Sequence, residues 1–270
     1  MRKIVGISSG SRNIDLNGNY ELKKIDSEIV KLSNKEMPNF LFLAHALDGE
    51  QQVEAFKEIK KVYSYMFNCK CRLLKKEDLE NIQTAKEMVD WADIIYESGG
   101  DTLNMVYLWK RTGFDKVLEE ASNDGKVMCG ESAGASCWFN GCITDSLRII
   151  YDDEDKPLVG MDCLNFVDLF CIPHGNMMER YVDSKDLLER NQRVGLLLAS
   201  TSIEIVGKHY RIIPNDIRYS EENVIPFALK MYWKDGEYIE EAIDMSEQHK
   251  SLSSLLEKKT KEKIKVYRSV

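Results

Sequence analysis

The sequence predicts an α/β protein whose mostly parallel sheet carries helices on both faces. Short apolar runs alternate with amphipathic stretches through the first half of the chain, and a Gly-x-Ser-x-Gly segment lies where a strand gives way to a helix. Alternating strands and helices are typical of a parallel sheet with helical crossovers. No internal repeat and no linker rich in Pro, Gly or Ser interrupts the 270 residues, so we expect one domain.

The first elements follow from the spacing of apolar residues. Residues 3–8 and 39–44 are continuous apolar runs typical of buried strands, and residues 21–32 between them have a helical pattern. Asp48 and Gln51 predict a capping box at the start of the next helix. Its apolar residues recur every three or four positions: Val53, Phe56, Ile59, Tyr63 and Met66.

The remaining elements become shorter toward the C-terminus. After residue 70 we expect strand 71–74, helix 76–89, strand 92–97, a helix from residue 102 that is interrupted at Gly113, and strand 126–129. Beyond residue 162 we expect strand 168–172, helix 178–193, and a hairpin of residues 202–206 and 210–213.

Composition narrows the function classes. The chain has 37 Lys and Arg against 45 Asp and Glu, a net charge of −8, which argues against sequence-independent binding of nucleic acid. No apolar run approaches the ~20 residues of a membrane-spanning helix. The seven cysteines are odd in number and form no CxxC pair, so we expect reduced thiols in a cytoplasmic protein without a disulfide framework. We expect neither a metal nor a cofactor, because the acidic run 152–155 lacks the pattern of a calcium loop.

The segment Gly130-Glu131-Ser132-Ala133-Gly134 has the pattern of a nucleophile elbow. A serine in a sharp strand-to-helix turn needs small neighbours, which the two glycines provide. The turn would place the backbone N–H of Ala133 and the start of the next helix beside the hydroxyl, where both stabilise a developing negative charge.

A serine nucleophile needs a base, and the chain has four histidines. His174 follows an apolar run and precedes Gly175, so it lies at a strand end, where open α/β sheets build their sites. His45 is placed similarly, whereas His209 and His249 fall in polar surroundings. We therefore favour His174 as the base.

Several segments together resemble the peptidase E and cyanophycinase family of serine peptidases. They are 130–135, 172–175, 97–104, 48–51 and 144–146, and the resemblance covers most of residues 1–215. It implies a flavodoxin-like sheet related to class I glutamine amidotransferases, with serine in place of their cysteine. The family's nucleophile and base map onto Ser132 and His174, and its oxyanion-hole glycine maps onto Gly100. Residues 216–270 would form a C-terminal extension of the core.

The third member of the triad has two candidates. Asp145 matches the position of an aspartate associated with catalysis in peptidase E relatives, and Glu204 is the nearest carboxylate to the later strand in which other relatives carry a glutamate. We rank Asp145 first and Glu204 second.

The resemblance implies a serine peptidase acting on short peptides, with N-terminal Asp-X dipeptides as one candidate substrate class. An aspartate side chain would need a nearby cation, for which the candidates are Arg148, Arg180, Arg190 and Arg193. The alternatives are an esterase that shares the elbow and a non-catalytic ligand-binding module that keeps the cleft. The sequence leaves the oligomeric state open, with a homodimer among the options.

Overall fold

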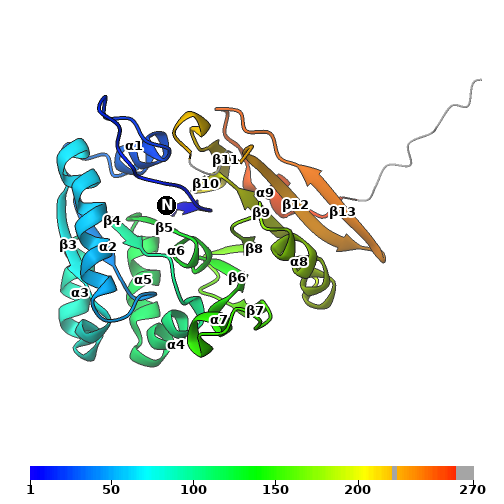
Figure 1. Cartoon of the computed structure of the whole chain (residues 1–270), viewed down its shortest axis with the longest axis horizontal. Coiled ribbons are helices and arrows are strands. Elements are labelled where there is room, and N and C mark those ends of the chain that lie inside the picture. Colours follow the sequence, from blue (N-terminus) through cyan, green and yellow to red (C-terminus); the bar gives the residue numbers. More distant parts are fainter. Residues whose placement is uncertain (221–223, 260–270) are drawn as a thin grey trace, which may run out of the picture.

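The structure, a computed structural model, describes residues 1–220 and 224–259 and contains two sheets flanked by helices (Figure 1). The first sheet has eight strands. In spatial order they are β14 (Lys250–Ser251), β11 (His209–Pro214), β10 (Thr201–Val206), β1 (Lys3–Ile7), β5 (Val127–Glu131), β4 (Ile94–Glu97), β2 (Asn39–Leu43) and β3 (Lys70–Leu74).

Five neighbouring strands of this sheet are parallel: β1, β5, β4, β2 and β3. Strand β10 pairs with β1 in the antiparallel direction. The carboxyl ends of the parallel strands meet at one edge of the sheet. The segments after β1, β2, β4 and β5 therefore gather there, as expected for a site-bearing edge of an open α/β sheet.

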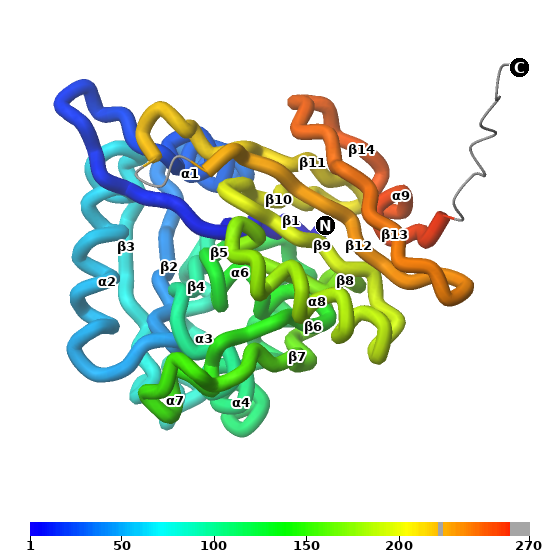
Figure 2. Tube along the Cα trace, turned by 45° about the vertical axis from the view of Figure 1, so that its right-hand side comes forward, coloured from blue at the N-terminus to red at the C-terminus, as the bar shows by residue number. Residues whose placement is uncertain are grey.

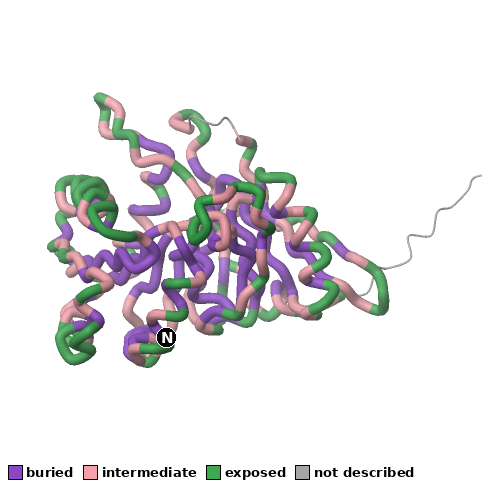
Figure 3. The backbone as a smooth tube through the Cα atoms, turned by 60° about the horizontal axis from the view of Figure 1, so that its bottom comes forward, coloured by how far each residue is buried: buried purple, intermediate pink, exposed green. Residues whose placement is uncertain are grey.

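Helices cover both faces of the first sheet. One face carries α1 (Lys23–Leu32), α2 (Gln51–Lys60) and the π-helical segment η1 (Lys61–Met66), which pack on β1, β2, β4 and β5. On the other face lie the 3₁₀ helix η2 (Lys76–Glu80), α3 (Ile82–Trp91), α4 (Thr102–Thr112), α5 (Phe114–Asn123) and the short α6 (Ala133–Ser136). Figure 3 shows buried residues concentrated in the centre of the molecule and exposed ones along its outer helices and loops.

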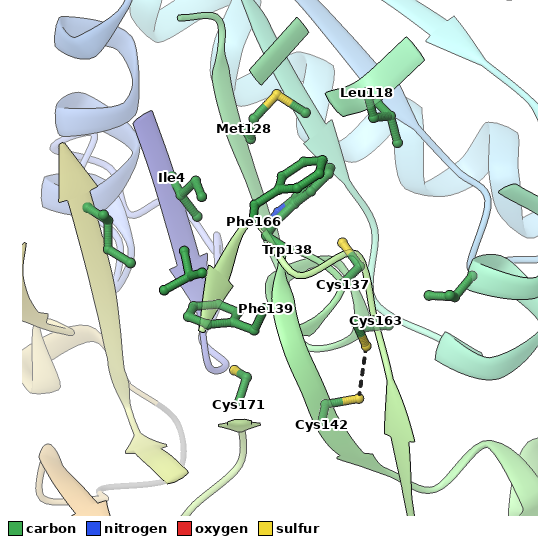
Figure 4. Close-up of a cluster of buried hydrophobic side chains, with 14 of the residues drawn as sticks. Ile4, Leu118, Met128, Cys137, Trp138, Phe139, Cys142, Cys163, Phe166 and Cys171 are labelled. Carbon is green, nitrogen blue, oxygen red and sulfur yellow. Dashed lines mark hydrogen bonds between the residues drawn. The ribbon is translucent and has the colours of Figure 1, made fainter. Parts of the chain in front are cut away.

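The second sheet has six strands. In spatial order the strands are β13 (Glu237–Ala242), β12 (Phe227–Lys234), β9 (Gly195–Ala199), β8 (Val167–Ile172), β6 (Phe139–Thr144) and β7 (Val159–Asp162). Helix α8 (Met178–Asn191) packs on one face of this sheet, whereas α7 (Ser146–Tyr151) follows β6 and contacts α4. One hydrophobic cluster joins the two sheets. Figure 4 shows Ile4 and Met128 of the first sheet beside Trp138, Phe139 and Cys171 of the segment that builds the second.

The C-terminal extension completes both sheets. Strand β12 pairs with β9 in the second sheet, and β14 pairs with β11 in the first. The 3₁₀ helix η3 (Ile217–Tyr219) precedes them and α9 (Leu252–Leu256) follows, so the extension crosses from one sheet to the other (Figure 2). Residues 221–223 and 260–270 of the expected extension lie outside the described residues.

The predicted α/β class is confirmed, and two local expectations are corrected. Helix 76–89 is divided, because the side chain of Asn81 accepts hydrogen bonds from the N–H groups of residues 83 and 84 and starts a new helix there. Asp48 is not a helix cap, because its carboxylate pairs with Lys76 and α2 begins without a side-chain cap. All seven cysteines are free thiols, and six of them are buried. No helix in the described part of the chain is long and apolar enough to cross a membrane.

Glu97 ends β4 and ties two loops of the carboxyl edge together. Its Oε1 accepts hydrogen bonds from the N–H groups of His45 and Ala46, at 3.0 and 3.2 Å, and from the N–H and hydroxyl of Ser98, at 3.0 and 2.9 Å. Burial raises the pKa of Glu97 to about 8 in spite of these hydrogen bonds, which lower it. Burial also lowers the pKa of the neighbouring His45 to about 3. Near neutral pH the two side chains are therefore an uncharged pair.

Protonation of Glu97 makes the stability of the fold depend on pH. A carboxyl whose pKa rises from 4.5 to about 8 on folding stabilises the protein fully below pH 4.5 and loses that contribution as the pH rises through 8. Each pKa unit corresponds to about 1.4 kcal/mol. We expect urea denaturation to give a lower free energy of unfolding at pH 9 than at pH 5, and Glu97→Gln, which mimics the protonated side chain, to reduce that decline.

The matched control is Glu87→Gln, which removes an equal charge from the exposed surface of α3. It should leave the pH dependence as in the unmodified protein. A decline of equal size in Glu97→Gln and the unmodified protein would contradict the assignment.

Candidate active site

Ser132 lies in a strained turn between β5 and α6. Its backbone has φ 52° and ψ −109°, a conformation that side-chain-bearing residues rarely adopt. A Cβ atom on Gly130 or Gly134 would lie 2.4 or 2.1 Å from the carbonyl oxygen of Glu97, so both positions require glycine. Helix α6 has only four residues, and its dipole is correspondingly weak.

His174 follows strand β8 and faces Ser132. Its Nε2 lies 2.8 Å from Ser132 Oγ, and its backbone has φ 56°, also in the left-handed region. The hydroxyl of Ser8 fixes this residue, because Ser8 Oγ accepts a hydrogen bond from the His174 N–H at 2.9 Å and donates one to the Leu198 carbonyl at 2.6 Å. Sequence reasoning missed Ser8, since a buried serine after a strand carries no distinguishing pattern.

The environment of His174 keeps its imidazole neutral. Burial lowers its pKa to about 4, and the positive charge of Arg180 acts in the same direction. The carboxylates of Asp145 and Glu131 oppose this shift, but they do not outweigh burial. Above about pH 5 the imidazole can therefore accept a proton from the serine hydroxyl.

Asp145 lies near this pair but contacts Arg180. Its Oδ2 accepts a hydrogen bond from Arg180 Nη2 at 2.6 Å, and Arg180 Nη1 donates to the carbonyl of Ile143 at 3.2 Å. No carboxylate oxygen in residues 1–220 or 224–259 lies within 4.0 Å of a His174 nitrogen. Asp145 thus acts on His174 through its charge and through Arg180.

Glu204, the second candidate, is engaged elsewhere. Strand β10 alternates, so Ile203 and Ile205 face the central core and Glu204 faces away from it. Its buried carboxylate accepts hydrogen bonds from Arg211 Nε and His249 Nε2, each at 2.8 Å. The structure therefore does not bring Glu204 to His174.

The four arginines considered as partners of a substrate aspartate have different surroundings. Arg148 forms a two-pronged pair with Glu179, at 2.9 Å for both contacts, Arg193 pairs with Asp162, and Arg190 is exposed. Of the four, only Arg180 acts on the pKa of His174.

The loop after β4 borders Ser132 through Gly99, and it borders the loop after β2 through Gly100. A Cβ on Gly99 would lie 3.4 Å from the Ser132 Cβ, an ordinary contact distance. Gly100 has φ 137°, and a Cβ there would lie 2.2 Å from the Ala46 carbonyl oxygen. The predicted oxyanion-hole residue Gly100 thus belongs to a loop that passes beside the serine, and Ala133 follows the serine directly.

A pocket of about 460 Å³ is lined in part by Ser98 and Gly99 of the loop after β4. Arg12, Tyr96 and Glu131 form its polar wall, and Phe42 and Ile59 are among its apolar residues. Arg12 and Glu131 were not expected as site residues, because their significance depends on a long-range contact that no local pattern reveals. In the described part of the chain, no group of three or more His, Cys, Asp and Glu side chains is arranged to hold a metal ion.

Comparison with known proteins gives this geometry a context. The sequence profile of peptidase family S51 matches residues 6–213. Uncharacterized peptidase YgaJ of Bacillus subtilis strain 168 is 30% identical over 179 residues, which cover 64% of this chain and 69% of that protein. Uncharacterized peptidase Lin0382 of Listeria innocua is 39% identical over 90 residues, 31% of this chain and 40% of that protein.

Solved structures share the fold. The crystal structure of a peptidase from an acI-B1 actinobacterium has a TM-score of 0.67 at 18% identity and covers 93% of this chain and 96% of that one. A protein of Listeria monocytogenes EGD-e, whose name provisionally assigns it to peptidase E, has a TM-score of 0.56 at 22% identity, covering 79% and 98%. Because the family profile matches more than half of the sequence, the chain belongs to peptidase family S51, the peptidase E family, and is a serine-type peptidase.

Proposed function

We propose that the protein hydrolyses short peptides with Ser132 as nucleophile and His174 as general base. The observation that carries this proposal is the 2.8 Å contact between His174 Nε2 and Ser132 Oγ, formed by two residues with left-handed backbones. Two strained residues held in contact are typical of a site maintained for function.

The reaction then follows from the arrangement of the site. Ser132 Oγ attacks the scissile carbonyl carbon while His174 Nε2 takes its proton, and the N–H groups of Gly100 and Ala133 stabilise the oxyanion. His174 donates the proton to the leaving amine as the C–N bond breaks, which leaves an acyl ester on Ser132. A water molecule, deprotonated by His174, hydrolyses this ester and restores the serine.

Asp145 has an indirect role in this proposal. As the imidazole becomes positively charged, the carboxylate favours that charge, whereas the guanidinium of Arg180 disfavours it. The opposite charges of Asp145 and Arg180 therefore partly cancel in their effect on the pKa of His174. We also place the reaction in the cytoplasm, because seven free thiols fit a reducing compartment.

A narrower form of the proposal is a preference for N-terminal aspartate. Its support is Arg180, a buried cation whose charge is felt at His174. The pairing of Arg180 with Asp145 limits what this cation can offer to a substrate carboxylate.

Labelling with a neutral organophosphonate tests the nucleophile. We expect the mass of the intact protein to increase by one adduct, and Ser132→Ala to abolish that increase because the attacking oxygen is gone. Ser253→Ala, which alters an exposed serine on α9, should label normally. If the unmodified protein never gains an adduct, the catalytic role of Ser132 is refuted and a ligand-binding module becomes the better description.

The pH dependence of kcat/KM tests the base. The acid limb reports the pKa of the free enzyme's base, which lies at about 4 for His174, well below the usual 6.5. Arg180→Gln removes a charge that lowers this pKa, so its acid limb should move to higher pH. Asp145→Asn removes a charge that raises it, so its limb should move to lower pH.

Circular dichroism of both variants controls for misfolding. An acid limb near pH 6.5 in the unmodified enzyme, or shifts in the same direction in both variants, would contradict this account of His174.

A panel of dipeptides that share the second residue and vary the first tests the aspartate preference. We expect Asp-Leu to be cleaved faster than Ala-Leu and Asn-Leu, and Arg180→Gln to remove the difference. An equal rate for all three would sink the aspartate assignment while leaving the peptidase proposal intact.

A further inference from the structure

The pocket beside Ser132, which we call the Glu131 pocket, lies at the carboxyl edge of the parallel strands. It is enclosed by the segment after β1 that includes Gly10 and Arg12, by α2 with Ile59, and by the loop after β4 with Gly99. Glu131 directly precedes Ser132, and Gly99 lies against the serine from the other side. The pocket is therefore lined by the direct neighbours of Ser132, although neither Ser132 nor His174 is itself a lining residue.

Among the described residues that line the pocket, Arg12 is the one cation, and a buried carboxylate already pairs with it. Arg12 donates from Nε and Nη2 to the two oxygens of Asp26, at 2.9 and 3.0 Å. Asp26 is fully buried and also accepts hydrogen bonds from the hydroxyls of Tyr20 and Tyr63. This arrangement fixes the guanidinium and neutralises it.

Glu131 then adds a second negative charge. Its Oε2 accepts hydrogen bonds from Arg12 Nη1 at 2.8 Å and from the Tyr96 hydroxyl at 3.1 Å. One guanidinium thus faces two carboxylates, Asp26 and Glu131, which leaves this group with a net charge of about −1. Glu58, the other carboxylate that lines the pocket, pairs with Lys61 at 2.6 Å. The Glu131 side chain keeps 35% of its surface exposed, so a ligand can reach the carboxylate.

The arrangement of Arg12, Asp26 and Glu131 favours a positively charged ligand over a negatively charged one. A carboxylate in the pocket would face a surplus negative charge and an arginine that is already engaged. A primary ammonium group would gain a charge-assisted hydrogen bond to Glu131, while Phe42 and Leu47 supply apolar contact for the carbon atoms attached to it.

We propose that the Glu131 pocket binds a primary ammonium group of the peptide substrate and that Glu131 is its specificity-determining partner. The inference rests on the proposed function, because it concerns the substrate of the same site. The ammonium can be the free α-amino group of the peptide or the side chain of a lysine, and both present the same chemistry to the carboxylate.

Three peptides distinguish these sources: Ala-Leu, with a free α-ammonium, N-acetyl-Ala-Leu, without a cation, and N-acetyl-Lys-Leu, with a side-chain ammonium. If the α-ammonium is bound, kcat/KM for Ala-Leu should exceed that for N-acetyl-Ala-Leu by about 10- to 100-fold, the usual effect of a charge-assisted hydrogen bond. If the side-chain ammonium of a lysine is bound, kcat/KM for N-acetyl-Lys-Leu should exceed that for N-acetyl-Ala-Leu by the same factor.

Glu131→Gln should remove the advantage of the cationic peptide. Glutamine can still accept hydrogen bonds from Arg12 and Tyr96 but lacks the charge. Because Glu131 also raises the pKa of His174, the variant affects every substrate to some extent. The ratio of kcat/KM between cationic and acetylated peptides cancels this shared effect and is the quantity to compare.

Glu54→Gln, on the exposed side of α2 and away from the pocket lining, is the matched control and should leave that ratio unchanged. Equal kcat/KM for all three peptides in the unmodified enzyme, or an unchanged ratio in Glu131→Gln, would overturn the proposal.

Binding measurements separate this proposal from the catalytic one. Calorimetry with Ser132→Ala should show tighter binding of the cationic peptide than of N-acetyl-Ala-Leu, and the double variant Ser132→Ala/Glu131→Gln should lose that difference. Equal binding of the two peptides to Ser132→Ala would overturn the ammonium proposal even where organophosphonate labels Ser132. Selective binding without any labelling of the unmodified protein would refute the catalytic role and leave the ammonium pocket standing.

Discussion

The close approach of two backbone segments is the constraint on which the rest of the site depends. The carbonyl oxygen of Glu97 occupies the space that a side chain on Gly130 or Gly134 would need. Strands β4 and β5 are therefore drawn together at their carboxyl ends, and the chain must turn sharply between the two glycines. Ser132 lies at the apex of that turn, and its strained backbone follows from the packing around it. The Glu97 side chain also stabilises the site, because it accepts hydrogen bonds from the loops after β2 and β4.

Local patterns predicted much of this arrangement. The parallel strands up to β5 follow from apolar runs, and the pairing of Ser132 with His174 follows from a glycine-flanked serine and a histidine at a strand end. The sequence predicted less of the second sheet, because strands such as β6 contain Asn140 and Gly141 and do not form an uninterrupted apolar run. Sequence also could not show that Asp145 faces Arg180, since this contact joins residues 35 positions apart.

Arg12 contacts Glu131, the neighbour of Ser132, and Arg180 acts on the pKa of His174. A carboxylate neutralises each of the two arginines. Arg12 is fixed by the fully buried Asp26, whereas Arg180 is itself buried and pairs with the partly exposed Asp145. Burying an unpaired guanidinium would be strongly unfavourable, so each partner is required by the fold as well as by the site. The surplus carboxylate beside Arg12 is Glu131, and unlike the fully buried Asp26 it is exposed enough for a ligand to reach.

The central position of β1 has a consequence for the nascent chain. Val5 pairs with Cys129 on one side and with Glu204 on the other, so β1 meets these partners only after 124 and 199 further residues have been made (129 − 5 and 204 − 5). Until then both of its edges are open and its apolar side chains lack their cover, a condition that favours slow folding and association with other chains.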